Sequence, residues 1–157
     1  MKFLSLVFVA AGILLAYPSV LQAEPGHDHS VAHETEHAGG AKGGRLLEGT
    51  EPHAEFFVEK DRSVTITFYD DSMNPVPVAE QKVVLIADAE GNKTTLEFEK
   101  KGVGLVSQGV LPVAESLNLV IQFIQDAESK PMNFRIAYDD KMCGECKRAE
   151  YACICGH

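Results

Sequence analysis

An alternation of apolar and polar residues with a period of two runs through positions 45–139 and constrains the fold more than any other feature. Alternate side chains of an extended chain point to opposite faces, so this pattern is typical of β-strands with one buried face. Positions 83–87 are apolar without interruption, which favours a central strand covered on both faces. The apolar faces comprise Ala54, Phe56 and Val58; Val64, Ile66 and Phe68; Leu96 and Phe98; Leu117, Leu119, Ile121 and Phe123; and Phe134, Ile136 and Tyr138.

Turn-forming residues separate these stretches. Asp, Asn and Pro residues are frequent at 70–77, Glu-Gly-Asn-Lys occupies 90–93, and Ser-Lys-Pro stands at 129–131. About seven short strands with such breaks, and no amphipathic helix, predict an all-β domain at 45–139, which we expect to be an immunoglobulin-like antiparallel β-sandwich. The Cys…Trp…Cys signature of true immunoglobulin domains is absent, since the chain has no Trp. A small open barrel is the alternative architecture.

The first 23 residues have the pattern of a secretory signal peptide. Lys2 precedes an apolar run at 3–16, and the small residue Ala23 marks the expected cleavage site. The run is shorter than the about 20 apolar residues of a membrane-spanning helix. We therefore expect cleavage after Ala23 and no membrane span in the mature protein, with an uncleaved anchor as the alternative. The expected location is secreted, with the oxidising periplasm as the first choice.

A polar stretch at 24–44 contains four of the six histidines. Its low apolar content and its glycines predict a flexible linker. Imidazole suits Zn, Cu and Ni, and spacings of two and four residues let the rings converge on one ion. The candidate ligands are His27, His29, His33 and His37. The alternative is a solvated linker whose histidines bind no metal.

All four cysteines lie in a C-terminal stretch, 140–157, which we expect to be a tail outside the strands. Their pattern is C-x2-C-x6-C-x-C-x-H, and the candidate metal ligands are Cys143, Cys146, Cys153, Cys155 and His157. Two close pairs of thiolates joined by a short return can form a tetrahedral site for a soft ion, Zn(II) or Cu(I). In a secreted chain the same cysteines can instead form two disulfides, with one cysteine of each pair joined to one of the other. A catalytic redox pair at Cys143 and Cys146 is the third option.

The charge balance and the motifs exclude several function classes. Acidic residues outnumber basic ones by 23 to 14, for a formal charge of -9, which argues against a nucleic-acid partner. The sequence contains no phosphate-binding loop or nucleophile elbow, so we expect no enzymatic activity. His53 stands alone on the polar face of an expected strand, and the pairs Asp70-Asp71 and Asp139-Asp140 are expected to be loop charges rather than a calcium site.

Three short motifs mark the first part of the expected domain. They are Gly43-Gly44-Arg45-Leu46-Leu47-Glu48, Pro52-His53-Ala54-Glu55-Phe56, and Phe68-Tyr69-Asp70-Asp71 followed by Pro75-Val76-Pro77-Val78. They resemble small secreted β-sandwich proteins of bacteria that accompany heavy-metal efflux adaptors, over about residues 40 to 125. Lys42 departs from the His that often precedes Gly-Gly there, and the cysteine stretch is not part of that pattern. The resemblance implies a periplasmic setting, metal handling and an efflux adaptor as partner.

The sequence therefore predicts a secreted, non-enzymatic protein that binds Zn or Cu, with Ni as a further option. Two alternatives remain open at this point. The first is a structural or interaction module with a disulfide-stapled C-terminus, and the second is a thiol–disulfide enzyme.

Overall fold

A computed structural model describes residues 39–155. The expected signal peptide, His27, His29, His33, His37 and His157 lie outside the described residues. The strands are β1 (Arg45–Leu47), β2 (His53–Val58), β3 (Ser63–Tyr69), β4 (Pro75–Val76), β5 (Lys82–Ala89), β6 (Asn92–Lys101), β7 (Gly104–Val110), β8 (Leu117–Ile124) and β9 (Met132–Tyr138), followed by a 3-10 turn, η1 (Glu150–Ala152). The prediction of an all-β domain is confirmed for this part of the chain.

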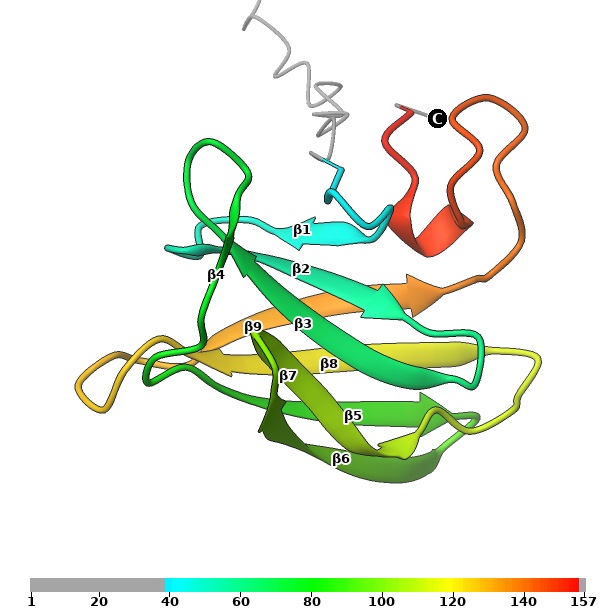
Figure 1. The fold of residues 1–157 in the computed structure, drawn as a ribbon. Helices are drawn as coiled ribbons and strands as arrows, with labels where there is room; N and C mark the ends of the chain where they lie inside the picture. Colours follow the sequence, from blue (N-terminus) through cyan, green and yellow to red (C-terminus); the bar gives the residue numbers. More distant parts are fainter. Residues whose placement is uncertain (1–38, 156–157) are drawn as a thin grey trace, which may run out of the picture. The chain divides into compact units, whose positions relative to one another are not determined.

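The nine strands form one antiparallel sheet that curls until it is nearly a closed barrel (Figure 1). Its order is β1-β2-β3-β7-β6-β5-β8-β9, with β4 added to the end of β3. Strand β6 connects the two halves of the curled sheet. Its residues up to Glu97 pair with β5, and its residues from Phe98 onward pair with β7. The immunoglobulin-like sandwich is thus not confirmed, and the arrangement is closer to the barrel alternative.

One core fills the inside of this curled sheet. The alternation predicted in β8 is confirmed, since Leu117, Leu119, Ile121 and Phe123 are all buried and the intervening Asn118 and Gln122 are exposed. Burial of each such side chain contributes about 1.5–3 kcal/mol. The prediction that 83–87 is covered on both faces is wrong, because burial alternates there as well and the side chains of Val84 and Ile86 are only half-buried.

The turn between β5 and β6 forms at the predicted place. Ala89 pairs with Asn92, and the two residues between them, Glu90 and Gly91, have φ values of 54° and 93°. Two consecutive residues with positive φ are typical of a two-residue hairpin turn that matches the twist of its strands. Gly91 adopts this conformation without steric cost.

The C-terminal segment packs into the core, contrary to the predicted tail. The side chain of Tyr151 is 5% exposed, and its ring lies 5.7 Å from that of Phe56 and 5.2 Å from that of Tyr138, centre to centre. The Val58 N–H donates to the Tyr151 hydroxyl at 3.1 Å. Turn η1 contacts both β1 and β9, the two end strands of the sheet. Residues 140–155 thus belong to the domain, because one aromatic side chain anchors them in its core.

The glycine-rich residues 39–44 are also part of the domain rather than of a linker. They cover the carboxylate of Glu55, which is fully buried on β2. The N–H groups of Lys42 and Gly44 donate to this carboxylate at 3.0 and 2.7 Å, and the Tyr69 hydroxyl donates at 2.7 Å. A Cβ atom on Gly40 would lie 2.0 Å from Glu55 Cδ, so only glycine allows this close approach.

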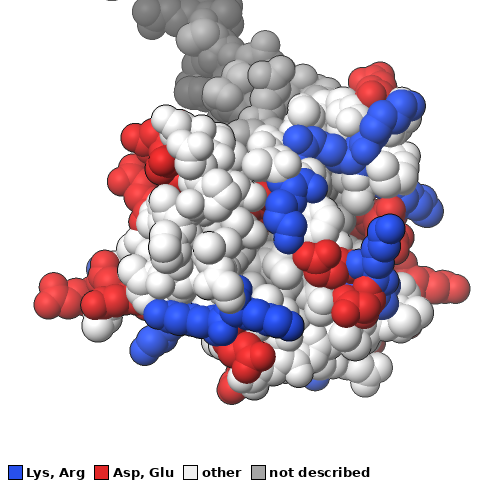
Figure 2. All heavy atoms as spheres, in the orientation of Figure 1, with Lys and Arg blue, Asp and Glu red and all other residues white. Residues whose placement is uncertain are grey.

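Charged side chains of both signs are interspersed on the face shown in Figure 2. Lys42 Nζ lies 3.0 Å from a carboxylate oxygen of Glu59 and 4.9 Å from the centre of the Phe57 ring. Among residues 39–155, no helix has the length and apolar character needed to cross a membrane.

Candidate metal centre

A short hairpin positions the first two cysteines. Met142 and Ala149 form an isolated β-bridge, and the Cys143 N–H donates to the Arg148 carbonyl at 2.8 Å. The Lys147 N–H returns to the Cys143 carbonyl at 3.2 Å, and Lys147 has a φ of 59°, which reverses the chain tightly. The C-x2-C spacing together with this reversal turns both sulfurs to the same side of the hairpin.

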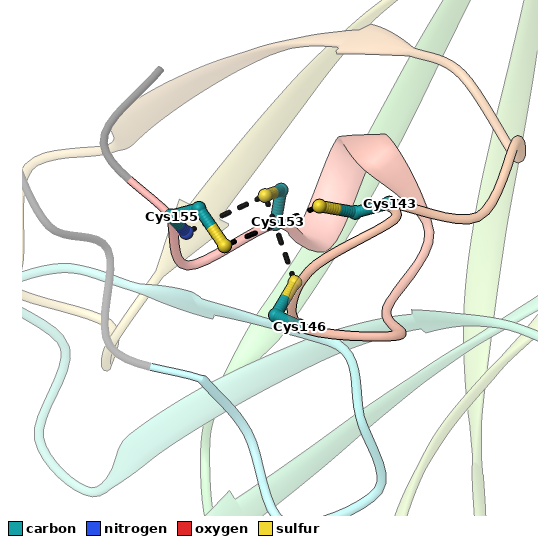
Figure 3. Close-up of side chains that lie close together, drawn as sticks. All are labelled: Cys143, Cys146, Cys153 and Cys155. Atoms are coloured by element: carbon teal, nitrogen blue, oxygen red, sulfur yellow. Dashed lines mark hydrogen bonds between the residues drawn. The ribbon is translucent and has the colours of Figure 1, made fainter.

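Turn η1 then brings the last two cysteines back to the first two. The Cys153 N–H donates to the Glu150 carbonyl at 3.1 Å, which ends the turn, and the chain continues through Cys155 past the hairpin. Figure 3 shows the four side chains pointing toward a common centre from these two segments. Tyr151 and Ala152 belong to η1 and are buried in the core of the domain. Their packing therefore fixes the position of Cys153, the next residue in the chain.

The four sulfurs have the spacing of a tetrahedral thiolate site. All four Sγ atoms lie within 4.8 Å of one another, with 3.6 Å between Cys146 and Cys153 and 4.0 Å between Cys143 and Cys155. Sulfurs about 2.3 Å from a central zinc ion in a tetrahedron lie about 3.8 Å from one another. The cysteines form no disulfide. The cluster therefore fits a single soft ion at its centre.

Backbone N–H groups that point at the sulfurs favour the thiolate form at one position. The N–H groups of Ile154 and Arg148 lower the pKa of Cys146 to about 6. At Cys153 the N–H of Cys155 acts in the same direction, but desolvation and the neighbouring sulfurs outweigh it and raise its pKa. Desolvation, followed by the three other sulfurs, raises the pKa of Cys155. A bound cation would favour ionisation of all four sulfurs, since metal ligation requires thiolates.

Burial differs between the four cysteines in a way that leaves an entry path. Cys143 is 2% exposed, whereas Cys146, Cys153 and Cys155 are half-buried. Cys143 is thus buried, whereas the other three cysteines are partly exposed to solvent, so an ion can enter from that side.

Arg148 connects the cysteine hairpin to the glycine-rich loop at residues 39–44. Its guanidinium donates to the carbonyls of Gly40 and Gly44 at 3.2 Å. The loop is consequently held from two directions, by the Glu55 carboxylate at its N–H groups and by Arg148 at its carbonyls. No pattern in the sequence assigned these roles to Glu55 and Arg148. The glycines at 39, 40 and 44 were the available signal, since glycine allows close approach of the backbone to other groups.

The other candidate residues do not join this centre within the described part of the chain. His53 lies at the start of β2, where its Nε2 is 3.6 Å from a carboxylate oxygen of Asp71. The Asp70 carboxylate accepts the N–H groups of Ser72 and Asn74 and so shapes the loop between β3 and β4. The positions of His157 and of the four N-terminal histidines fall outside the described residues.

Comparisons of the chain with protein-family models, with curated proteins and with solved structures found no match.

Proposed function

We propose that this chain is a secreted, non-enzymatic metal-binding protein that holds a soft ion on the thiolates of Cys143, Cys146, Cys153 and Cys155. The observation that carries the proposal is the spacing of the four sulfurs, all within 4.8 Å of one another and not joined as disulfides. A site of four sulfurs in a tetrahedron suits Zn(II), and thiolates also suit Cu(I). Zn(II) is the first choice, because the sulfur separations of 3.6 and 4.0 Å lie on either side of the about 3.8 Å expected around a tetrahedral zinc ion.

The setting of this site follows from the sequence. A signal peptide that ends at Ala23 would deliver the protein to the periplasm. There, His27, His29, His33 and His37 would add nitrogen ligands for Zn, Cu or Ni, and His157 is a further nitrogen donor near the thiolates in sequence. The resemblance of residues 40–125 to companions of heavy-metal efflux adaptors supports such an adaptor as the protein partner.

Metal titration of the reduced protein tests the thiolate site. Native mass spectrometry should find one tightly held Zn(II) or Cu(I) that is lost when Cys143 and Cys146 are both changed to Ser. Glu145→Gln is the matched control, because this exposed residue lies between the two cysteines and is expected to leave binding unchanged. Equal metal binding by the Cys143→Ser, Cys146→Ser double variant would refute the proposal.

A second candidate function is a structural or interaction module whose C-terminus is braced by two disulfides. The short distances between Cys146 and Cys153 and between Cys143 and Cys155 favour it, because each pair joins the hairpin to the segment after η1. Mass spectrometry under non-reducing conditions separates the two candidates. The structural or interaction module would be established if two disulfides persist during metal exposure and no ion is bound before or after reduction.

A further inference from the structure

The spacing of the four cysteines allows two chemical states of the same cluster. A disulfide bond is about 2.0 Å long. The sulfurs of Cys146 and Cys153, at 3.6 Å, would have to approach by about 1.6 Å to form one, and those of Cys143 and Cys155, at 4.0 Å, by about 2.0 Å. Small side-chain movements thus convert four metal-binding thiolates into two cross-linked pairs.

We propose that the cluster is a redox-gated metal site, in which a hydroperoxide oxidises Cys146 and Cys153 to a disulfide and thereby releases the bound ion. The inference rests on the proposed metal-binding function and names the regulation of that site. The second pair, Cys143 and Cys155, is oxidised only after the ion has left. A thiol reductant restores the four ligands, and the site then binds metal again.

The oxidation balances with hydrogen peroxide as a two-electron oxidant. The Cys146 thiolate attacks one peroxide oxygen, the O–O bond breaks, and hydroxide leaves as a sulfenic acid forms on Cys146. The Cys153 thiolate attacks that sulfur, the S–S bond forms, and the sulfenic oxygen leaves as a second hydroxide. Two protons from solvent convert the hydroxides to water. A Zn(II) ion keeps its oxidation state and is released because two of its four thiolate ligands have become a disulfide.

Burial and distance decide which pair reacts first. Cys146 and Cys153 are both half-buried, so a peroxide reaches either sulfur from solvent, whereas Cys143 is 2% exposed. Any disulfide that includes Cys143 therefore requires the site to open. A disulfide between Cys153 and Cys155 would close a very small, strained ring, since one residue separates them. Cys146 and Cys153 are both accessible, and their sulfurs, 3.6 Å apart, lie closer together than those of Cys143 and Cys155 at 4.0 Å.

The experiment uses the full reduced chain loaded with Zn(II) and treated with hydrogen peroxide in the presence of a chromogenic zinc chelator. With one equivalent of peroxide we expect one zinc ion to be released for each peroxide consumed, with a mass loss of two hydrogens from the protein and recovery of zinc binding after thiol addition. Zinc that stays bound while peroxide is consumed overturns the redox gating, as does release that yields sulfinic acids without a disulfide. A reduced chain that binds no zinc refutes the proposed function instead, so the two failures are distinguishable.

A matched pair of double variants tests which cysteines join. Cys143→Ser with Cys155→Ser leaves the expected pair, and Cys143→Ser with Cys153→Ser leaves Cys146 with Cys155. Both keep two cysteines from different segments and remove the same number of ligands. The first should form its intramolecular disulfide about tenfold faster or more, because its sulfurs are already placed for attack. Equal rates, or faster closure in the second variant, overturn the assigned pairing.

Discussion

Truncation of Tyr151 tests whether the C-terminal segment is part of the core. In Tyr151→Ala the domain loses a side chain that is 5% exposed and contacts the rings of Phe56 and Tyr138. Removal of a buried aromatic side chain costs about 3–5 kcal/mol of unfolding free energy, because buried contacts are lost and a cavity remains. For a protein of typical stability, about 5–15 kcal/mol, this is a large fraction of the total.

The variant Tyr151→Phe separates the ring from its hydroxyl. It keeps the packing and removes only the acceptor of the Val58 N–H, so we expect a loss of about 0.5–1.5 kcal/mol. Urea unfolding of the reduced, metal-free protein measures both variants against the wild type, with the free energy in water obtained by linear extrapolation. A loss below about 1 kcal/mol for Tyr151→Ala would show that the segment is a tail after all, and the packing argument would fail.

Four further predictions concern other parts of the chain. Glu55→Gln should lower the free energy of unfolding by about 1.5–3 kcal/mol, because charge-assisted hydrogen bonds to a buried group are lost. Trypsin should then cut faster after Lys42, and an unchanged cleavage rate would argue against Glu55 as the anchor of the loop at residues 39–44. Deletion of 24–37 should lower the number of bound Zn or Cu ions and leave urea unfolding unchanged, and equal metal uptake would make this stretch a plain linker. The exported protein should begin at Glu24 by intact mass, and retention of Met1 would disprove cleavage. In the metal-free protein Cys146 should be alkylated first at pH 7, because its pKa is lowered to about 6. The rate of its alkylation should fall as the pH drops through that value, since less of the thiol is then ionised. Peptide mapping that finds another cysteine modified first would contradict this.

Local patterns made much of this fold predictable. The faces of β8 and the turn at Glu90 and Gly91 follow from residues that are neighbours in sequence, since strand periodicity and turn conformation are local properties. The gathering of the four cysteines was predictable for the same reason, because they lie between positions 143 and 155.

The way in which the strands join was harder to predict. Alternation says which face of a strand is buried but not which strands pair, so it cannot separate a sandwich from a curled sheet. That choice depends on β6, which pairs with β5 through one half and with β7 through the other. The alternating burial of β5 has a related cause, because only the inner face of a curled sheet meets the core.

Isolated long-range contacts were not predictable from local patterns. Tyr151 stands in a polar, cysteine-rich stretch without periodicity, yet its ring packs against β2 and β9. Glu55 occupies a position that alternation assigns to solvent, and only the glycine-rich loop, folded over it, explains its burial. Both cases depend on residues that are distant in sequence.

The contacts between the two ends of the domain have a consequence for the order of folding. Arg148 reaches Gly40 across 108 positions of the chain, and Tyr151 reaches Val58 across 93. Contacts between such distant positions form slowly, because the entropy of loop closure opposes them until the intervening chain has folded. Synthesis proceeds from the N-terminus. The apolar core of the earlier strands therefore stays partly exposed until Tyr151 has been synthesised. Nascent or truncated chains that end before Tyr151 should therefore aggregate readily and need chaperones more than chains that include Tyr151.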